Sequence, residues 1–300
     1  MNFTVEAWSP DFGAAYEADE EPTAPTEVAL EARAWEPIGP RGPAPSDVTF
    51  VDGVARIDAQ VWITDDDGPK PGLCATMAAG AIRCNAAARV HDPRVMRALI
   101  TGAASAEPIQ TAHARYAVVR WAGDAEALAQ AVTERMRALE AEVARAAAQA
   151  PLMVLDGLLW GREDVTNAIG FVKSHRRRYL DDEHQAVVHG LPAGTRSPVF
   201  LVSTAIRSWF SWYLRLPGGA GHPMAGMVRC EASNALEVAD AIGLADLSCA
   251  ALPRFASEAH RDPRAPQNLY PIGGLERDLR HRMGDARLLE RALRAAARPA

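Results

Sequence analysis

A long amphipathic helix with strand-like runs on both sides is the feature that most limits the fold of this chain. Residues 124–148 are rich in Ala, Glu, Leu, Arg and Met, and Leu128, Val132 and Leu139 recur at the spacing of an apolar helix face. Pro151 marks the end of this pattern. Strand-rich stretches before and after the helix, and a helical C-terminal part, predict a mixed α/β (α+β) fold.

The other expected elements follow from apolar runs and turn signals. Strands are expected at residues 48–51, 57–63, 73–84, 116–121, 152–155, 168–173, 199–206, 209–216 and 227–232, and helices at 124–148, 236–242, 247–258 and 274–297. The runs at 209–216 and 227–232 flank a Gly/Pro-rich loop, so a hairpin is expected there. One more short strand is expected at 28–35.

Composition sets the broad class of the protein. Apolar residues make up 48% and charged residues 23% of the 300 residues, as in globular proteins. The net charge of −6 excludes a protein that coats nucleic acid by bulk charge, but it allows a local basic patch. Residues 16–46 are acidic and Pro-rich, so we expect an extended, partly mobile segment at 1–46 and one folded domain at 47–300.

The sequence also bears on location and on cysteine chemistry. It has no run of about 18 apolar residues, so no membrane-spanning helix is expected. Its N-terminus lacks the basic start and apolar stretch of a signal peptide, so a cytoplasmic location is expected. The cysteines lack zinc-site spacing and have apolar neighbours, which predicts buried, reduced thiols at Cys74, Cys84, Cys230 and Cys249.

Two aspartates carry the strongest functional signal. Asp52 follows the apolar run 48–51, Asp156 follows 152–155, and a glycine comes after each. Side chains at strand ends point to the region where α/β sheets bind ligands, and paired carboxylates suit Mg²⁺ or Mn²⁺. Two such ions ~3.5–4 Å apart stabilise both the attacking and the leaving oxygen of phosphodiester cleavage. Asp-Gly is also a common turn signal, so the nuclease interpretation depends on the pair.

A third carboxylate is expected from the helix that precedes residue 152. Its candidates are Glu134, Glu140 and Glu142. Glu140 and Glu142 are two residues apart and cannot share a helix face. Glu140 lies at the edge of the apolar stripe and Glu142 further toward solvent, but the residues alone leave the choice open.

The segment 173–179 (KSHRRRY) is the densest basic stretch of an otherwise acidic chain. We expect Lys173 to hold the scissile phosphate. The positive residues after it are expected to contact nucleic acid: His175, Arg176, Arg177 and Arg178. The alternative is a solvated surface run, which is how most charge clusters are used.

Two other features have mainly structural interpretations. A bend at Gly53 is expected to separate Asp58 from Asp52, which leaves Asp58 outside the set of metal ligands. The aromatic cluster of Trp209, Trp212 and Tyr213 could stack on bases, but sheet and core packing is the favoured interpretation.

Four short motifs, in this order along the chain, resemble the nuclease domain of the NurA family. They are Phe50–Gly53 (FVDG); a helix ending at Pro151 that carries a glutamate some sixteen residues before the next aspartate; Met153–Gly157 (MVLDG) followed by Gly170–Ser174 (GFVKS); and Asn268–Glu276 (NLYPIGGLE). The resemblance spans residues 47–285. It implies an RNase H-like fold with a central mixed β-sheet flanked by helices.

The resemblance implies a Mn²⁺- or Mg²⁺-dependent DNA nuclease acting in DNA repair. Such enzymes form homodimers and process double-strand breaks with a HerA-type hexameric ATPase, on single strands or duplex ends. Lys173 would face the phosphate, and Tyr270 would contact nucleic acid at the edge of the site. The implied metal ligands are Asp52, Glu140, Asp156 and Glu276.

The sequence departs from the family pattern at two positions. Val54 stands where the family often has serine after the first Asp-Gly. Glu276 stands where the family often has a metal-binding histidine, and His281 lies more than a helical turn further on. Glutamate also binds Mn²⁺ or Mg²⁺. Two alternatives therefore stay open: a catalytically inactive partner of a motor ATPase, and an RNase H-like enzyme that acts on RNA.

Overall fold

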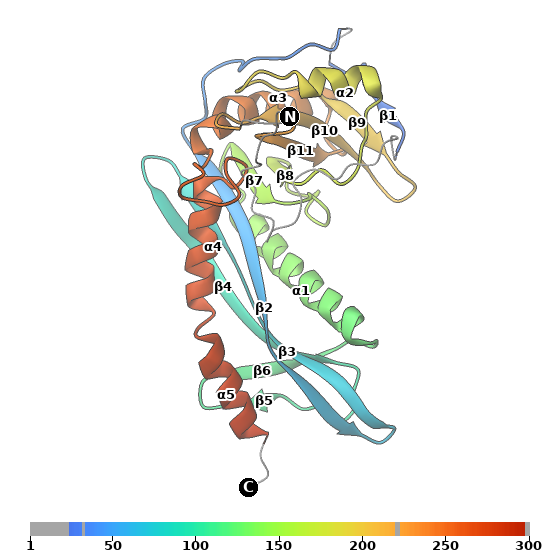
Figure 1. Cartoon of the computed structure of the whole chain (residues 1–300), viewed down its shortest axis with the longest axis vertical. Helices are drawn as coiled ribbons and strands as arrows, with labels where there is room; N and C mark the ends of the chain where they lie inside the picture. Colours follow the sequence, from blue (N-terminus) through green and yellow to red (C-terminus); the bar gives the residue numbers. More distant parts are fainter. Residues whose placement is uncertain (1–23, 32–33, 220–222, 298–300) are drawn as a thin grey trace, which may run out of the picture. The chain divides into compact units, whose positions relative to one another are not determined.

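The computed structural model describes residues 24–31, 34–219 and 223–297, and the chain divides into two compact units (Figure 1). Within these described ranges, the first unit comprises the residues up to Val51 together with Ile82–Arg89 and Ala147–Gly274. The second comprises Asp52–Ala81, Val90–Ala146 and the residues from Leu275 onward. No helix in the described ranges is both long enough and apolar enough to cross a bilayer.

Runs of strands are separated by helices, and the last part of the described chain is helical, as the mixed α/β prediction requires. The strands are β1 (Thr26–Glu27), β2 (Val48–Asp65), β3 (Gly68–Cys84), β4 (Ala88–Thr101), β5 (Ile109–Gln110), β6 (Arg115–Arg120), β7 (Leu152–Asp156), β8 (Ala168–Val172), β9 (Phe200–Ser203), β10 (Ser208–Arg215) and β11 (Met227–Ser233). The helices are α1 (Ala125–Ala146), α2 (Asp182–His189), α3 (Val238–Ala251), the short 3₁₀ helix η2 (Leu252–Phe255), α4 (Tyr270–Arg282) and α5 (Ala286–Ala296).

The strands form a mixed sheet in the order β1-β9-β10-β11-β8-β7-β2-β3-β4-β6-β5. In the first unit, β7 pairs in parallel with both β2 and β8, whereas β8, β11, β10 and β9 pair antiparallel in that order. The β10–β11 pair confirms the predicted hairpin. Helix α3 packs on β7, β10 and β11, so the predicted central mixed sheet with flanking helices is confirmed.

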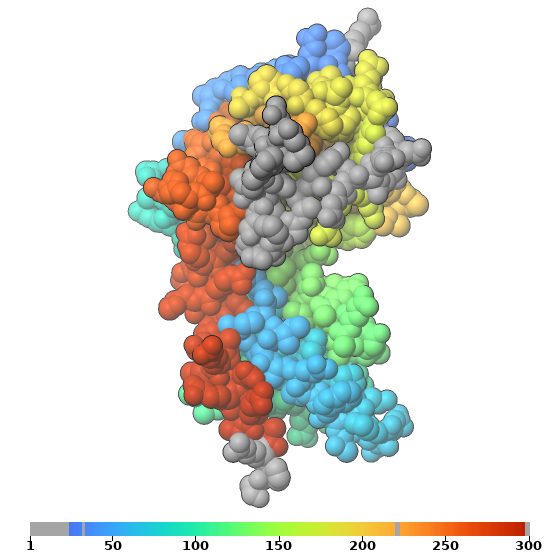
Figure 2. Space-filling view, viewed as in Figure 1, coloured from blue at the N-terminus to red at the C-terminus, as the bar shows by residue number. Residues whose placement is uncertain are grey.

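In the second unit, apolar side chains of α1 pack on β3 and β4. Leu128 and Val132 share one buried cluster with Met77 and Ile100, which fixes the orientation of the helix. Helix α5 contributes Leu289 and Leu293 to a second cluster, and its outer surface is drawn in red in Figure 2. The predicted amphipathic helix is therefore confirmed, with its apolar stripe facing the strands.

Asp58 is buried inside the second unit and is fully occupied by hydrogen bonds. It accepts from Arg56 Nε at 2.8 Å, from Thr76 Oγ1 at 2.5 Å and from the Tyr116 hydroxyl at 2.9 Å. A buried carboxylate with this many donors is a structural element of the sheet. Burial and the charge of Asp58 raise the pKa of Tyr116, which keeps the phenol protonated as a donor.

The structure corrects the expected strand break after Asp52. Strand β2 runs without interruption, so Asp52 lies within a strand rather than at its end. Gly53 has extended backbone and makes no turn there. A Cβ atom at Gly53 would lie 2.5 Å from Glu140 Oε1, so the glycine accommodates the close approach of that side chain. Asp156, by contrast, ends β7, and Gly157 turns the chain with a φ of +86° as expected.

The C-terminal helices also differ from the prediction. The two helices expected at 236–242 and 247–258 are one helix, α3, followed by η2. The helix expected at 274–297 is divided into α4 and α5 by Gly284, whose φ is +81°. Asp285 then starts α5 by accepting a hydrogen bond from the Leu288 amide at 2.7 Å.

Strand β4, helix α2 and the two-residue strand β5 have no counterpart in the sequence prediction. Strand β4 has mainly polar or partly exposed residues over its first half, so it lacks the apolar pattern of a buried strand. Helix α2 is only eight residues long and is capped by Asp181, whose side chain accepts from the His184 amide.

The acidic N-terminal segment is anchored to the first unit by Arg196, within its described residues. Glu31 accepts from Arg196 at 2.6 and 2.8 Å, and Asp246 pairs with the same guanidinium, which is fully buried. Although burial would raise the pKa of Glu31, the hydrogen bonds from Arg196 hold it below its usual value. Glu31, within the segment that was expected to be extended and partly mobile, is thus held by a buried ion pair. The strand expected at 28–35 is wrong for its described part, because β1 ends at Glu27.

Replacing Glu31 should destabilise the protein strongly. Glu31→Ala leaves the buried Arg196 with Asp246 as its remaining carboxylate, so we expect a loss of about 3 kcal/mol in the free energy of unfolding. Denaturant titration measures this loss. The matched control is Glu36→Ala, an exposed residue that should change stability by less than about 0.5 kcal/mol. Equal stabilities of the two variants would contradict the anchoring role of Glu31.

Candidate metal centre

Strand pairing brings Asp52 and Asp156 to neighbouring backbone positions. Strands β2 and β7 are parallel, and Val51 lies opposite Leu155. The next residue in each strand is an aspartate. Asp52 is buried, and its Oδ1 accepts a hydrogen bond from the Gly53 amide at 2.8 Å.

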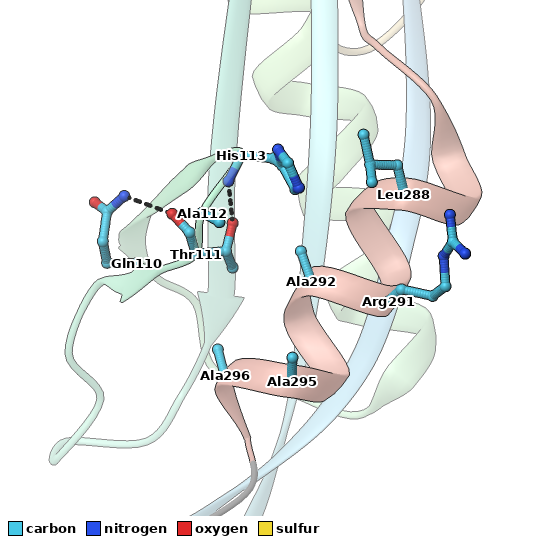
Figure 3. A pocket seen from close by; sticks show the side chains of 9 residues that line it. All are labelled: Gln110, Thr111, Ala112, His113, Leu288, Arg291, Ala292, Ala295 and Ala296. Carbon is cyan, nitrogen blue, oxygen red and sulfur yellow. Dashed lines mark hydrogen bonds between the residues drawn. The ribbon is translucent and has the colours of Figure 1, made fainter. Parts of the chain in front are cut away.

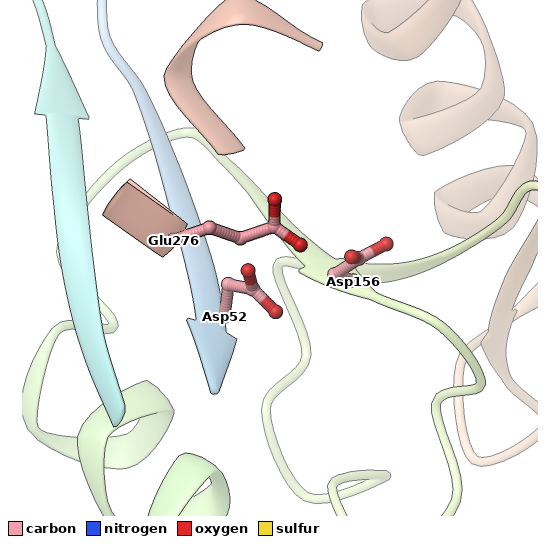
Figure 4. Close-up of side chains that lie close together, drawn as sticks. All are labelled: Asp52, Asp156 and Glu276. Atoms are coloured by element: carbon pink, nitrogen blue, oxygen red, sulfur yellow. The ribbon is translucent and has the colours of Figure 1, made fainter. Parts of the chain in front are cut away.

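Glu276 on α4 joins these two aspartates (Figure 4). Each of the three residues offers one carboxylate oxygen, and these oxygens all lie within 4.8 Å of one another. Oxygens that share a Mg²⁺, Mn²⁺ or similar ion at ~2.0–2.6 Å can lie up to about 5 Å apart, so the spacing fits a common cation. The described part of the chain contains no other group of three His, Cys, Asp or Glu residues with such spacing.

Lys173 is tied directly to Asp156. Its Nζ donates to Asp156 Oδ2 at 2.6 Å and to Asn268 Oδ1 at 2.9 Å. Asn268 is fully buried and in turn donates to Asp262 Oδ2 at 2.7 Å. Sequence reasoning placed Asn268 only inside a motif and did not identify it as the residue that orients Lys173.

Asp156 keeps one oxygen available for a ligand. Within the described residues, its Oδ1 is buried and accepts no hydrogen bond, while Oδ2 holds Lys173. A buried carboxylate oxygen without a donor is costly unless a ligand satisfies it. Three carboxylates whose oxygens lie this close repel one another, so these residues fit a divalent cation that would offset the repulsion.

Glu140 and Glu142 have clearly different surroundings. Glu140 is buried and its side chain lies against Gly53, next to Asp52 in the chain. It is not one of the three carboxylates whose oxygens lie within 4.8 Å. Glu142 is exposed and forms an ion pair with Arg94 at 3.0 Å. The structure therefore distinguishes the two glutamates that the sequence left open, with Glu140 on the buried side.

The basic segment separates into buried and exposed residues. His175 is buried, and its Nε2 donates to the Met227 carbonyl at 3.1 Å, so the expected contact with nucleic acid is wrong for this residue. Arg178 donates to the Leu180 carbonyl at 2.8 Å and pairs with Asp182. Arg176 and Arg177 are exposed, as a phosphate-contacting role requires.

The aromatic residues considered for contact with bases have different surroundings. Trp209, Trp212 and Tyr213 are buried, which confirms the core interpretation. The Tyr270 hydroxyl donates to Glu258 at 2.9 Å, and Arg261 lies over its ring. Tyr270 is the first residue of α4, and its hydroxyl is held by the side chain of Glu258. Its contact with nucleic acid stays a prediction.

A separate pocket of about 450 Å³ lies beside β5 and α5 (Figure 3). Its lining includes His113, Leu288 and Arg291 but no carboxylate and none of the predicted site residues. This pocket therefore lacks the ligands that a divalent cation needs.

Comparisons with known proteins bear on the fold. No family model matches the chain, and no curated protein sequence matches it. Among solved structures, the crystal structure of the NurA nuclease from Sulfolobus solfataricus is similar, with a TM-score of 0.51 over 87% of this chain and 88% of that one. The sequences are 11% identical over the match, so the similarity establishes a shared fold, as the four motifs predicted.

Burial of His175 should make stability depend on pH. Burial foremost, with the charge of Arg229, lowers the pKa of His175 to about 4. The unfolded chain therefore binds more protons, and stability falls as the pH drops below about 6.5. From pH 7 to pH 5 the wild type should lose about 2 kcal/mol more than His175→Gln, which has no group titrating in this range at that position. Denaturant titrations at both pH values measure the difference, and parallel losses would contradict it.

Proposed function

We propose that this chain is a member of the NurA family and a divalent-metal-dependent DNA nuclease. The observation that carries the proposal is the set of three carboxylate oxygens, from Asp52, Asp156 and Glu276, within 4.8 Å of one another. The shared fold with a NurA nuclease supports the reaction class. Mn²⁺ or Mg²⁺ held by these residues would stabilise the negative charge that develops on the phosphodiester.

The residues around the carboxylates have distinct proposed tasks. Lys173 would exchange part of its contact with Asp156 for a non-bridging oxygen of the scissile phosphate, because its ammonium is already oriented by Asn268. The exposed Arg176 and Arg177 would hold neighbouring phosphates of the strand. Glu140 would support the backbone beside Asp52 or act as a fourth ligand.

Several finer predictions are carried by the resemblance. They are assembly as a homodimer, a HerA-type ATPase partner, a role in double-strand break repair and a nuclease domain that spans residues 47–300. The cytoplasmic location expected from the sequence also stays a prediction.

Neutralising the carboxylates should abolish cleavage without unfolding the protein. Asp52→Asn, Asp156→Asn and Glu276→Gln should each lower Mn²⁺-dependent cleavage of labelled DNA by more than about 100-fold. In metal-free buffer each variant should remain folded, with a cooperative thermal transition. Each should also lose the rise in melting temperature that Mn²⁺ gives the wild type.

Glu142→Gln is the matched control, because Glu142 is an exposed glutamate that pairs with Arg94. It should retain both cleavage and the metal-dependent shift. Wild-type cleavage by all three site variants would refute the metal centre. Saturable Mn²⁺ binding without cleavage of any nucleic acid would favour the inactive-partner alternative, and cleavage of RNA alone would favour the RNA alternative.

Lys173→Gln should separate phosphate contact from metal binding. We expect the cleavage rate to fall by about 10²-fold, because a positive group aimed at the reacting phosphate is lost. Mn²⁺ affinity, measured by calorimetry, should stay the same or increase, since Asp156 is released from its ion pair. A loss of Mn²⁺ binding in this variant would instead assign Lys173 to holding Asp156 in place.

A further inference from the structure

An exposed tryptophan with an arginine against its ring lies in the first unit. Trp160 is 52% exposed. The Arg207 guanidinium carbon lies 5.1 Å from the centre of the Trp160 ring and 4.0 Å from that of the buried Trp209. The arginine thus contacts both aromatic residues, and more than half of the Trp160 surface stays accessible to a ligand.

Glu231 holds the backbone next to Trp160 and the side chain of Arg207 in place. It is fully buried, and its Oε2 accepts from the Leu159 amide at 3.1 Å. The same carboxylate lies 3.4 Å from Arg207 Nη2 and accepts from Arg229 Nη1 at 2.8 Å. One buried acid therefore holds both the residue next to Trp160 and the arginine beneath its ring, so the platform of Trp160 and Arg207 is preorganised.

The platform is close in the chain to the proposed catalytic carboxylate. The Gly157 amide donates to the Phe171 carbonyl at 2.9 Å, and a Cβ at Gly170 would lie 2.6 Å from the Leu159 nitrogen. The loop after Asp156 therefore folds tightly over β8. Trp160 lies four positions after Asp156 in the chain, so their Cα atoms lie within ~14 Å, a span of about four stacked nucleotides.

We propose that Trp160, supported by Arg207, is the surface on which an unpaired DNA base stacks near the cleavage site. Every base has a π-face, but in a duplex that face is covered by its neighbours, so the platform selects single strands or frayed ends. The arginine adds a cation next to the stack and a positive charge for the strand. This inference rests on the proposed function, because it assigns the base-contacting part of the same site.

Exposure alone does not distinguish Trp160, because single apolar residues are common on protein surfaces. Trp62 on β2 is 67% exposed, and no cation lies against its ring in the described part of the chain. Trp160 differs by its arginine, its buried anchor and its position after Asp156. Trp62 therefore serves as the matched control.

The test measures DNA binding by the full chain in EDTA, where cleavage does not interfere. Fluorescence anisotropy gives the Kd for a labelled oligothymidylate and for a blunt hairpin duplex. Trp160→Ala should weaken binding of the single strand about tenfold and leave the duplex Kd within about twofold. Trp160→Phe should retain most of the affinity, and Trp62→Ala should match the wild type.

Abasic substitution identifies the stacked base. A series of oligonucleotides with one abasic residue at successive positions should reveal one position at which the wild type loses about tenfold in affinity. Trp160→Ala should show no further loss at that position. Thermal melting checks that the variant is folded, and Trp160→Phe provides the second variant if Trp160→Ala melts early.

The outcomes separate this inference from the proposed nuclease. Unchanged binding by Trp160→Ala, or an equal loss for single strand and duplex, would overturn the base-stacking role even if the wild type cleaves DNA. If Trp160→Ala loses only single-strand binding and the wild type cleaves no DNA, the platform is supported and the nuclease is refuted. If Trp160→Ala keeps full DNA affinity but no longer binds a partner protein, the platform is assigned to that protein instead.

Discussion

The parallel pairing of β2 with β7 is the interaction on which the candidate site depends. Val51 lies opposite Leu155, and the residues before them in both strands are buried. Both faces of these strands are buried, so a slip of one residue would exchange side chains of different size between two packed faces. The packing of these apolar residues, which cannot bind a metal or act in catalysis, therefore places the two aspartates side by side.

Charge balance is the second constraint on the site. Carboxylates that approach within 4.8 Å repel one another, and Lys173 forms an ion pair with one of them, Asp156. The lysine is useful because Asn268 holds it in place, and Asn268 is itself anchored by Asp262. The site thus combines a rigid positive group with a cluster of carboxylates, an arrangement suited to binding a divalent cation next to a phosphate.

Two glycines near the site are required by space rather than by a turn. A side chain at Gly53 would collide with Glu140, and one at Gly170 would collide with the backbone at Leu159. The first allows a buried acid to approach β2, and the second allows the loop after Asp156 to fold over β8. Close backbone approach therefore determines the surroundings of the metal centre, and it also positions the base-stacking residue proposed above.

By itself the sequence determined the mixed α/β class, the long helix and the strand end at Asp156, because apolar periodicity and turn residues are local signals. Only the tertiary structure buried Glu140 and exposed Glu142, buried the ring of His175 and extended β2 through Asp52. These features depend on which distant residues pack together, and a pattern of neighbours in the chain carries no information about such contacts.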